Sequence, residues 1–138
     1  MTPLSVTKSD DLPIQSDDDV VRVRKLVRDV AKDIGLSLVD QTKIVTAASE
    51  LARNTLIYGG GGHAVVEVVI NGNRRGARVI FEDQGPGIAD VAMAMKDGFT
   101  TGSGLGLGLG GAKRLSDDFE IASESGKGTR ISIVKWKY

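Results

Sequence analysis

Glycine occupies nearly every second position of residues 102–111, which read Gly-Ser-Gly-Leu-Gly-Leu-Gly-Leu-Gly-Gly. Glycine has no Cβ, so such a run exposes its backbone N–H groups and accepts backbone angles that other residues avoid. The residues that follow have a helical pattern, and the start of a helix adds the positive end of its dipole. The run therefore predicts a site for phosphate groups. A flexible linker is the alternative, although glycine linkers alternate with serine rather than leucine.

Two simpler phosphate-binding motifs fit this run poorly. Residues 106–111 match the dinucleotide pattern G-x-G-x-x-G. That pattern should follow a strand and open a doubly wound unit, whereas a polar segment, residues 97–103, precedes the glycines here. The lysine of a Walker motif is missing as well, because Lys127 is followed by Gly128 rather than by serine or threonine. Neither motif explains the glycine run.

The composition excludes several classes of protein. Eighteen basic and eighteen acidic residues balance, so nothing indicates binding to nucleic acid or to an anionic membrane. The absence of cysteine excludes disulfides and thiolate metal sites. No apolar run is long enough to span a bilayer, and the N-terminus does not resemble a signal peptide. We expect one cytoplasmic domain, residues 1–138, with a single core.

The pattern of apolar residues predicts an α+β fold. Ser16, followed by three aspartates, predicts the start of a helix that ends near Gly35. A second helix is expected over residues 39–58, where four glycines end it. The remaining pattern predicts strands at 4–8, 64–70, 77–81, 119–123 and 129–136, and short helices at 88–96 and 107–116. The expected architecture is a two-layer sandwich, with helices on one face of a small mixed or antiparallel sheet.

Two polar residues lie on one face of the second expected helix. Glu50 and Asn54 are four residues apart, so they are separated by about one helical turn, roughly 6 Å. Both could simply face solvent. In the functional interpretation the amide oxygen of Asn54 binds Mg²⁺, and Glu50 accepts a proton from an attacking hydroxyl group or water. Arg53 belongs to a neighbouring face and is expected to be solvated.

A carboxylate at the end of a strand is the third candidate functional group. Asp83 precedes Gln84-Gly85-Pro86-Gly87, a sequence typical of a tight loop. An ionised aspartate only accepts hydrogen bonds, and adenine presents an amino donor where guanine presents a carbonyl acceptor. Asp83 should therefore favour adenine, unless it is only a structural turn residue.

Taken together, these segments resemble the motifs of the Bergerat-fold ATPase and kinase superfamily. Residues 50–54 are similar to its N box, residues 83–87 to its first glycine box and residues 102–110 to its second. Gly128-Thr129 is similar to the final pair of that family. The resemblance extends from about Ser16 to the end and implies ATP and Mg²⁺ as cofactors.

The resemblance also implies a role for each matching residue. Glu50 would be the catalytic base and Asn54 a ligand of Mg²⁺, while Asp83 would bind the adenine amino group with help from Thr129. Gly85 and Gly87 would let the backbone approach the base. Gly104, Gly106 and Gly108 would close over the phosphates, with residues 97–103 as a short ATP lid. The implied nucleotide-binding positions are Asn54, Asp83, Gly85, Gly87, Gly102, Gly104, Leu105, Gly106, Leu107, Gly108 and Thr129.

Within this superfamily, a chain of this size resembles the anti-sigma factor serine/threonine kinases. Its motifs are most similar to the RsbT type, whose members phosphorylate a STAS-domain antagonist and then activate a PP2C-type phosphatase. An RsbW/SpoIIAB-like protein that sequesters a sigma factor is the alternative. A homodimer stays open for either type.

Overall fold

Five antiparallel strands form one sheet in the order β1-β2-β3-β5-β4. The computed structural model describes residues 4–88, 95 and 108–138. The strands are β1 (Ser5–Ile14), β2 (Gly62–Asn71), β3 (Arg74–Asp83), β4 (Asp118–Ser123) and β5 (Thr129–Trp136). Every pair of neighbouring strands is antiparallel, which removes the mixed alternative and leaves no doubly wound unit among the described residues.

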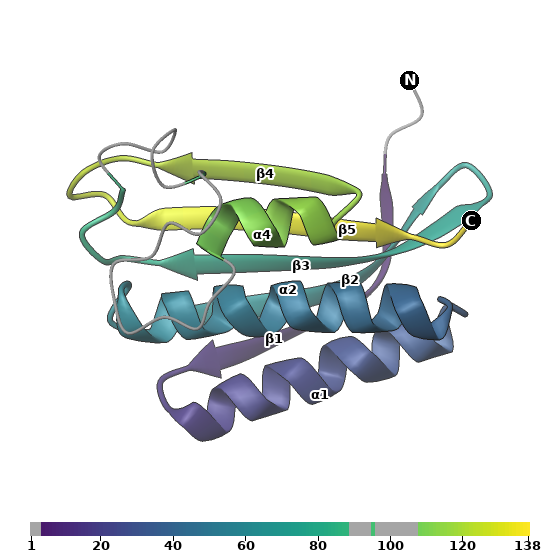
Figure 1. The fold of residues 1–138 in the computed structure, drawn as a ribbon, viewed down its shortest axis with the longest axis horizontal. Coiled ribbons are helices and arrows are strands. Elements are labelled where there is room, and N and C mark those ends of the chain that lie inside the picture. The colour runs from purple at the N-terminus through teal and green to yellow at the C-terminus, as the bar shows by residue number, and fades with distance from the viewer. Residues whose placement is uncertain (1–3, 89–94, 96–107) are drawn as a thin grey trace.

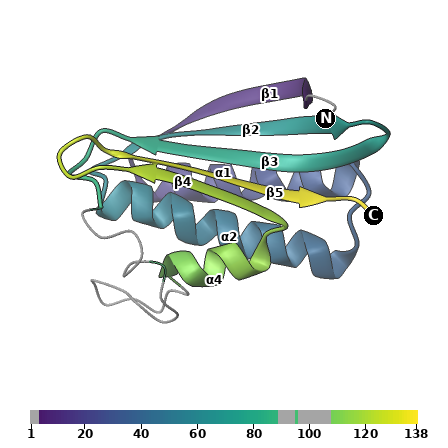
Figure 2. The same cartoon turned by 90° about the horizontal axis from the view of Figure 1, so that it is seen from above.

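Three helices cover one face of this sheet: α1 (Asp17–Asp33), α2 (Leu38–Ile57) and α4 (Gly108–Leu115). Figure 1 shows them in front of the sheet, and Figure 2 shows the two layers edge-on. The predicted α+β two-layer sandwich with helices on one face is therefore confirmed. The core lies between the layers and includes Phe81, Ile44, Leu51 and Ile133.

The helix starts follow the predicted capping chemistry. The Ser16 hydroxyl accepts the N–H of Asp19, and the Ser37 hydroxyl accepts the N–H of Asp40. Asp19 also accepts the N–H of Gln15 at 2.8 Å and pairs with Arg22 at 2.6 Å. These hydrogen bonds, led by the one from Gln15, hold the pKa of Asp19 below its ordinary value.

Helix α4 is rich in glycine and depends on its neighbour. Gly110 and Gly111 are buried within it, although glycine is about 1 kcal/mol less favourable than alanine in a helix. Helix α4 packs against α2, whose buried face carries Ala47 and Ala48. Small residues on both helices permit close packing, so contacts with α2 offset the poor intrinsic helicity of α4.

The first strand is longer than predicted. It continues past residue 8 to Ile14, through Asp10, Asp11 and Pro13. Those residues argue against a strand, but β1 is at the edge of the sheet, where proline is tolerated because one side of the strand has no partner. The short helix expected at 88–96 and the lid expected at 97–103 fall outside the described residues, apart from Ile88 and Met95.

Candidate nucleotide-binding and catalytic site

One row of paired residues crosses the end of the sheet beside the C-terminus of α2. Asp83 is opposite Gly62 on β2 and opposite Thr129 on β5, which is in turn opposite Ser123 on β4. Side chains alternate along a strand, so Asp83 shares the helix-covered face with Phe81, two residues earlier. The row therefore places the Asp83 and Thr129 side chains on the same face, where the helical layer ends.

The Asp83 carboxylate is fixed by its own loop. The N–H of Gly85 donates to Asp83 Oδ1 at 2.9 Å, and Oδ2 makes no hydrogen bond within the described residues. Gly59 lies directly against this carboxylate, since a Cβ on Gly59 would stand 2.6 Å from Oδ2. One carboxylate oxygen is thus used by the loop, and the other stays available as an acceptor.

Glycines make the loop around Asp83 possible. Gly85 packs on Gly59, where a Cβ would come within 2.7 Å of the Gly59 carbonyl oxygen. Gly87 has φ +74°, and a Cβ there would clash with the backbone of Glu124. Gly128, at φ +83°, leaves the same small space beside the backbone of Asp83. No side chain fits at these positions, so the loop and the β4–β5 hairpin are in backbone contact.

Ser123 connects the parts of this site and was not found from the sequence. Its hydroxyl accepts the N–H of Ile88 at 2.8 Å and donates to the carbonyl of Gly128 at 3.1 Å. It also lies 2.8 Å from Thr129 Oγ1. Ser123 has one hydroxyl proton, so either hydroxyl can be the donor between Ser123 and Thr129, and the 2.8 Å contact joins them in both arrangements. Serine at the end of a strand is too common a pattern to have indicated this role.

Glu50 and Asn54 lie one turn apart on α2, as predicted, and both are half-buried. The N–H of Gly108 donates to Glu50 Oε1 across 3.4 Å, which connects α2 to the first residue of α4. The Asn54 side chain makes no hydrogen bond to any described residue. Arg53 is exposed, in agreement with its expected solvation.

Asn54 is also joined to the Asp83 loop through the backbone. Its carbonyl accepts the N–H groups of Tyr58 and Gly59 at 2.9 and 3.2 Å, which ends α2. Gly59 then reaches the Asp83 carboxylate, so the two predicted sites meet at this residue. The sequence predicts only that residues 59–62 end the helix. The structure adds that Gly59 and Gly62 have no room for a side chain.

The glycine run is described only from Gly108 onward. Gly108 has φ +68°, and its N–H is directed to Glu50. The other predicted phosphate-binding positions lie outside the described residues: Gly102, Gly104, Leu105, Gly106 and Leu107. Their role stays a prediction.

The described residues fit a bound nucleotide with a magnesium ion. A half-buried amide without a hydrogen-bond partner, Asn54, lies one turn from the Glu50 carboxylate. The loop after Asp83 is held by backbone contacts that a Cβ at Gly85, Gly87 or Gly128 would disrupt. Among the described residues no group of three or more His, Cys, Asp or Glu side chains could hold a metal alone. Mg²⁺ retains several waters and shares substrate phosphates, so it does not need such a group.

Comparison with known proteins agrees with the fold and identifies the family. Residues 39–138 match the family described as histidine kinase-, DNA gyrase B- and HSP90-like ATPases, and the chain belongs to this family. It is 49% identical over 123 residues to the serine/threonine-protein kinase RsbT of Bacillus subtilis, covering 89% of this chain and 92% of RsbT. The expectation of an RsbT-like, ATP-dependent protein kinase is confirmed by this similarity.

More distant relatives carry a different name. The chain is 31% identical over 119 residues to an anti-sigma F factor of Thermoanaerobacter, with 82% of each chain covered. A crystal structure of RsbU and RsbW domains from Mycobacterium tuberculosis superposes with a TM-score of 0.61 at 24% identity. It covers 97% of this chain but only 32% of that longer chain, and it supports the fold. No helix among the described residues is long and apolar enough to cross a membrane.

Proposed function

We propose that this protein transfers the γ-phosphoryl group of ATP to a serine or threonine of a STAS-domain antagonist, and that it afterwards activates a PP2C-type phosphatase. The observation that carries the proposal is the pairing of Glu50 with Asn54 at the end of α2 that adjoins the Asp83 loop. The 49% identity to RsbT supports the protein substrate. Mg²⁺ and both partners are part of the proposal.

Asp83 and Thr129 select adenine in this proposal. Asp83 Oδ2 accepts from the amino group of the base, since Oδ1 is already used by Gly85. The Thr129 hydroxyl, beside Ser123, holds a water that accepts the second amino proton. Gly85 and Gly87 hold the loop that carries Asp83 in place, because each packs against backbone where a side chain would clash. Guanine offers an acceptor at that place and would face the Asp83 carboxylate unfavourably.

Asn54 and Glu50 act at the other end of the nucleotide. Bound ATP with Mg²⁺ supplies the transferable phosphoryl group and neutralises part of its charge. The Asn54 amide oxygen is the protein ligand of the ion. Glu50 accepts the proton of the substrate hydroxyl as that hydroxyl attacks, and the Gly108 N–H holds its carboxylate in place through Oε1.

The catalytic role of Glu50 is tested by Glu50→Gln. The amide retains an oxygen for the Gly108 N–H but cannot take up the proton, so phosphoryl transfer to the purified antagonist should fall by about 10²-fold or more. The Kd for ATP, measured by isothermal titration calorimetry, should stay within about threefold, because Glu50 contacts no adenine group in this proposal. Glu120→Gln, on the exposed face of β4, is the matched control. Transfer at a near-normal rate in Glu50→Gln would remove Glu50 as the base.

The anti-sigma F factor relatives favour a second candidate function, the sequestration of a sigma factor. Nucleotide would then act as a switch of a binding surface. The two functions differ in what co-purifies with the protein. Phosphoryl transfer to the antagonist without binding to any sigma factor supports the kinase-activator function, whereas a stable complex with a sigma factor supports sequestration.

A further inference from the structure

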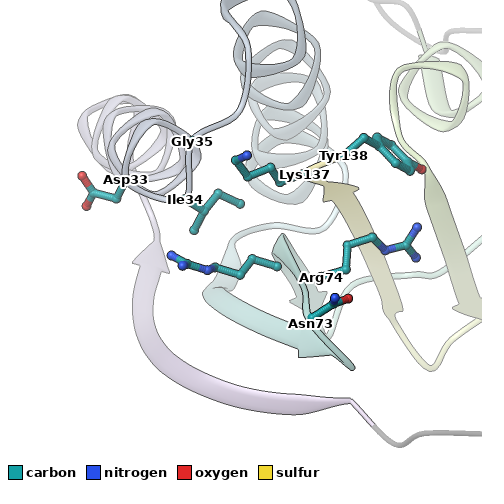
Figure 3. A pocket seen from close by; sticks show the side chains of 8 residues that line it. Asp33, Ile34, Gly35, Asn73, Arg74, Lys137 and Tyr138 are labelled. Carbon is teal, nitrogen blue, oxygen red and sulfur yellow. The ribbon is translucent and has the colours of Figure 1, made fainter.

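A hollow lies at the end of the sheet opposite the Asp83 site. Figure 3 shows this hollow, which has a volume of about 500 Å³. It is lined by Asp33, Ile34, Gly35, Asn73, Arg74, Arg75, Lys137 and Tyr138. Arg74 opens β3 and Asp83 closes it, so the two sites are separated by about 30 Å of extended strand. Nothing in the proposed kinase mechanism uses this end of the molecule.

The charges that line the hollow are unbalanced. Arg74, Arg75 and Lys137 contribute three cations, and among the described residues none has a carboxylate within 4.0 Å. Among the lining side chains Asp33 carries a carboxylate, and it is directed away from the other labelled side chains in Figure 3. Neighbouring cations on the same strands are paired, since Lys135 lies 3.0 Å from the Asp117 carboxylate. The hollow therefore attracts a negative group from outside the described residues.

Arg74 is held in a fixed orientation. Its guanidinium lies 4.5 Å from the centroid of the Trp136 ring and 5.4 Å from that of Tyr138. The Trp136 ring packs over Gly76, where a Cβ would stand 2.7 Å from it, and its N–H donates to Asp118 at 2.7 Å. A guanidinium fixed on aromatic rings keeps its edge donors free. The Arg74 side chain therefore lies with Trp136 on the face of the sheet away from the helices, whereas Arg75, the next residue of β3, is directed to the helix-covered face.

Large apolar side chains are exposed at the same end. Leu38 and Val39 are 79% and 64% exposed at the start of α2, three and four residues after Gly35. Tyr138, which lines the hollow, is 79% exposed. Cations in a hollow beside exposed apolar side chains suit a protein segment that carries both acidic and apolar residues. A flat anionic membrane would contact the rim, whereas a protruding side chain reaches cations inside a hollow.

We propose that this basic hollow binds an acidic segment of a protein partner that is not the phosphoryl acceptor. The inference rests on the proposed function in one respect: the acceptor hydroxyl must reach Glu50, which lies near the opposite end of the sheet. The partner that fits is therefore the PP2C-type phosphatase. Its aspartate or glutamate side chain pairs with the guanidinium of Arg75 and with the ammonium of Lys137, and its apolar side chains cover Leu38 and Val39.

The test compares two partners with one set of variants. The double variant Arg75→Glu/Lys137→Glu reverses two charges in the hollow and leaves the Arg74 stack intact. Arg24→Glu/Arg28→Glu reverses two exposed charges one turn apart on α1 and is the matched control. For each variant, calorimetry measures the Kd for the phosphatase of the same bacterium at low and high salt, and labelled ATP measures transfer to the STAS-domain antagonist. Circular dichroism checks folding, and Arg75→Gln/Lys137→Gln replaces the reversal if that variant unfolds.

The double reversal should weaken phosphatase binding by about tenfold or more, and the loss should shrink as salt rises. The α1 control should bind as the parent does, and all variants should still phosphorylate the antagonist. A phosphatase that binds the double reversal as tightly as the parent, or that does not bind the parent at all, overturns the proposal. A parent protein that fails to phosphorylate the antagonist would count against the proposed kinase function and not against the basic hollow, because binding is measured separately.

Discussion

Replacing Asp83 with asparagine should separate adenine binding from folding. Oδ1 of Asp83 accepts the Gly85 N–H at 2.9 Å, and this bond fixes how an asparagine would be oriented. Its oxygen would stay with Gly85, and its amide N–H₂ group would take the place of Oδ2. The adenine amino group would then meet a donor instead of a charged acceptor.

The expected change in the Kd for ATP follows from replacing this acceptor with a donor. A hydrogen bond to a charged acceptor contributes about 1.5–3 kcal/mol, and opposed donors add to the loss. Since about 1.4 kcal/mol is a tenfold change, the Kd for ATP should rise by roughly 10-fold to 150-fold. The same amide group matches the carbonyl acceptor of guanine, so the preference for ATP over GTP should shrink or reverse.

Calorimetric titration with ATP and GTP measures both effects. Glu82→Gln is the matched control, because Glu82 is the adjacent residue on the opposite face of β3, where it lies near His63 and Arg130. Its Kd values should equal those of the parent. The thermal unfolding midpoint of Asp83→Asn without nucleotide should stay close to the parent value, since the Gly85 bond is retained. An ATP Kd within threefold of the parent, with unchanged preference over GTP, would refute the role of Asp83.

Three further predictions concern stability. Gly87→Ala should destabilise the protein by more than about 1 kcal/mol, measured by urea unfolding. The loss should exceed that of Gly60→Ala, because Gly60 has a similar positive φ but open space around it. Equal losses would contradict the close approach of Gly87 to the Glu124 backbone. Ser123→Ala should cost about 1–3 kcal/mol and weaken ATP binding, because the Ile88 N–H loses its acceptor; an unchanged urea midpoint would exclude this network. The lowered pKa of Asp19 means that its carboxylate stabilises the fold above pH 3.8 and loses this effect as the pH falls through the lowered value. Asp19→Asn should therefore lower the unfolding midpoint at pH 7 and converge with the parent in acid, whereas a constant difference down to pH 2 would contradict the assignment.

The helices and most strands could be predicted because local chemistry specifies them. Ser16 and Gly35 bound the first helix as capping residues do, and α2 was predicted to within one residue at each end. The first strand was underestimated because its extension depends on pairing with β2, which is far away in the sequence. Local composition at Pro13 pointed away from a strand, and only tertiary pairing overrides it.

The residues of the candidate site show the same difference between local chemistry and long-range pairing. Glu50, Asn54 and Asp83 were found because their residue types and spacing carry chemistry. Ser123 was not found, since its role arises from sheet register, which brings it beside Thr129 and the N–H of Ile88. Sequence spacing specifies what a side chain can do, whereas the long-range pairing of strands specifies which other side chains it meets.

The row of paired residues that includes Asp83 limits where the chain accepts insertions. One extra residue in β3 before Asp83 would move its carboxylate to the outer face and bring Glu82 to the helix-covered face. Two extra residues would restore the face but shift the pairing with Thr129. An addition in the two-residue turn between β2 and β3, at the far end, leaves this register unchanged. Length variation among functional homologues should therefore concentrate at that turn and be absent between Gly76 and Asp83.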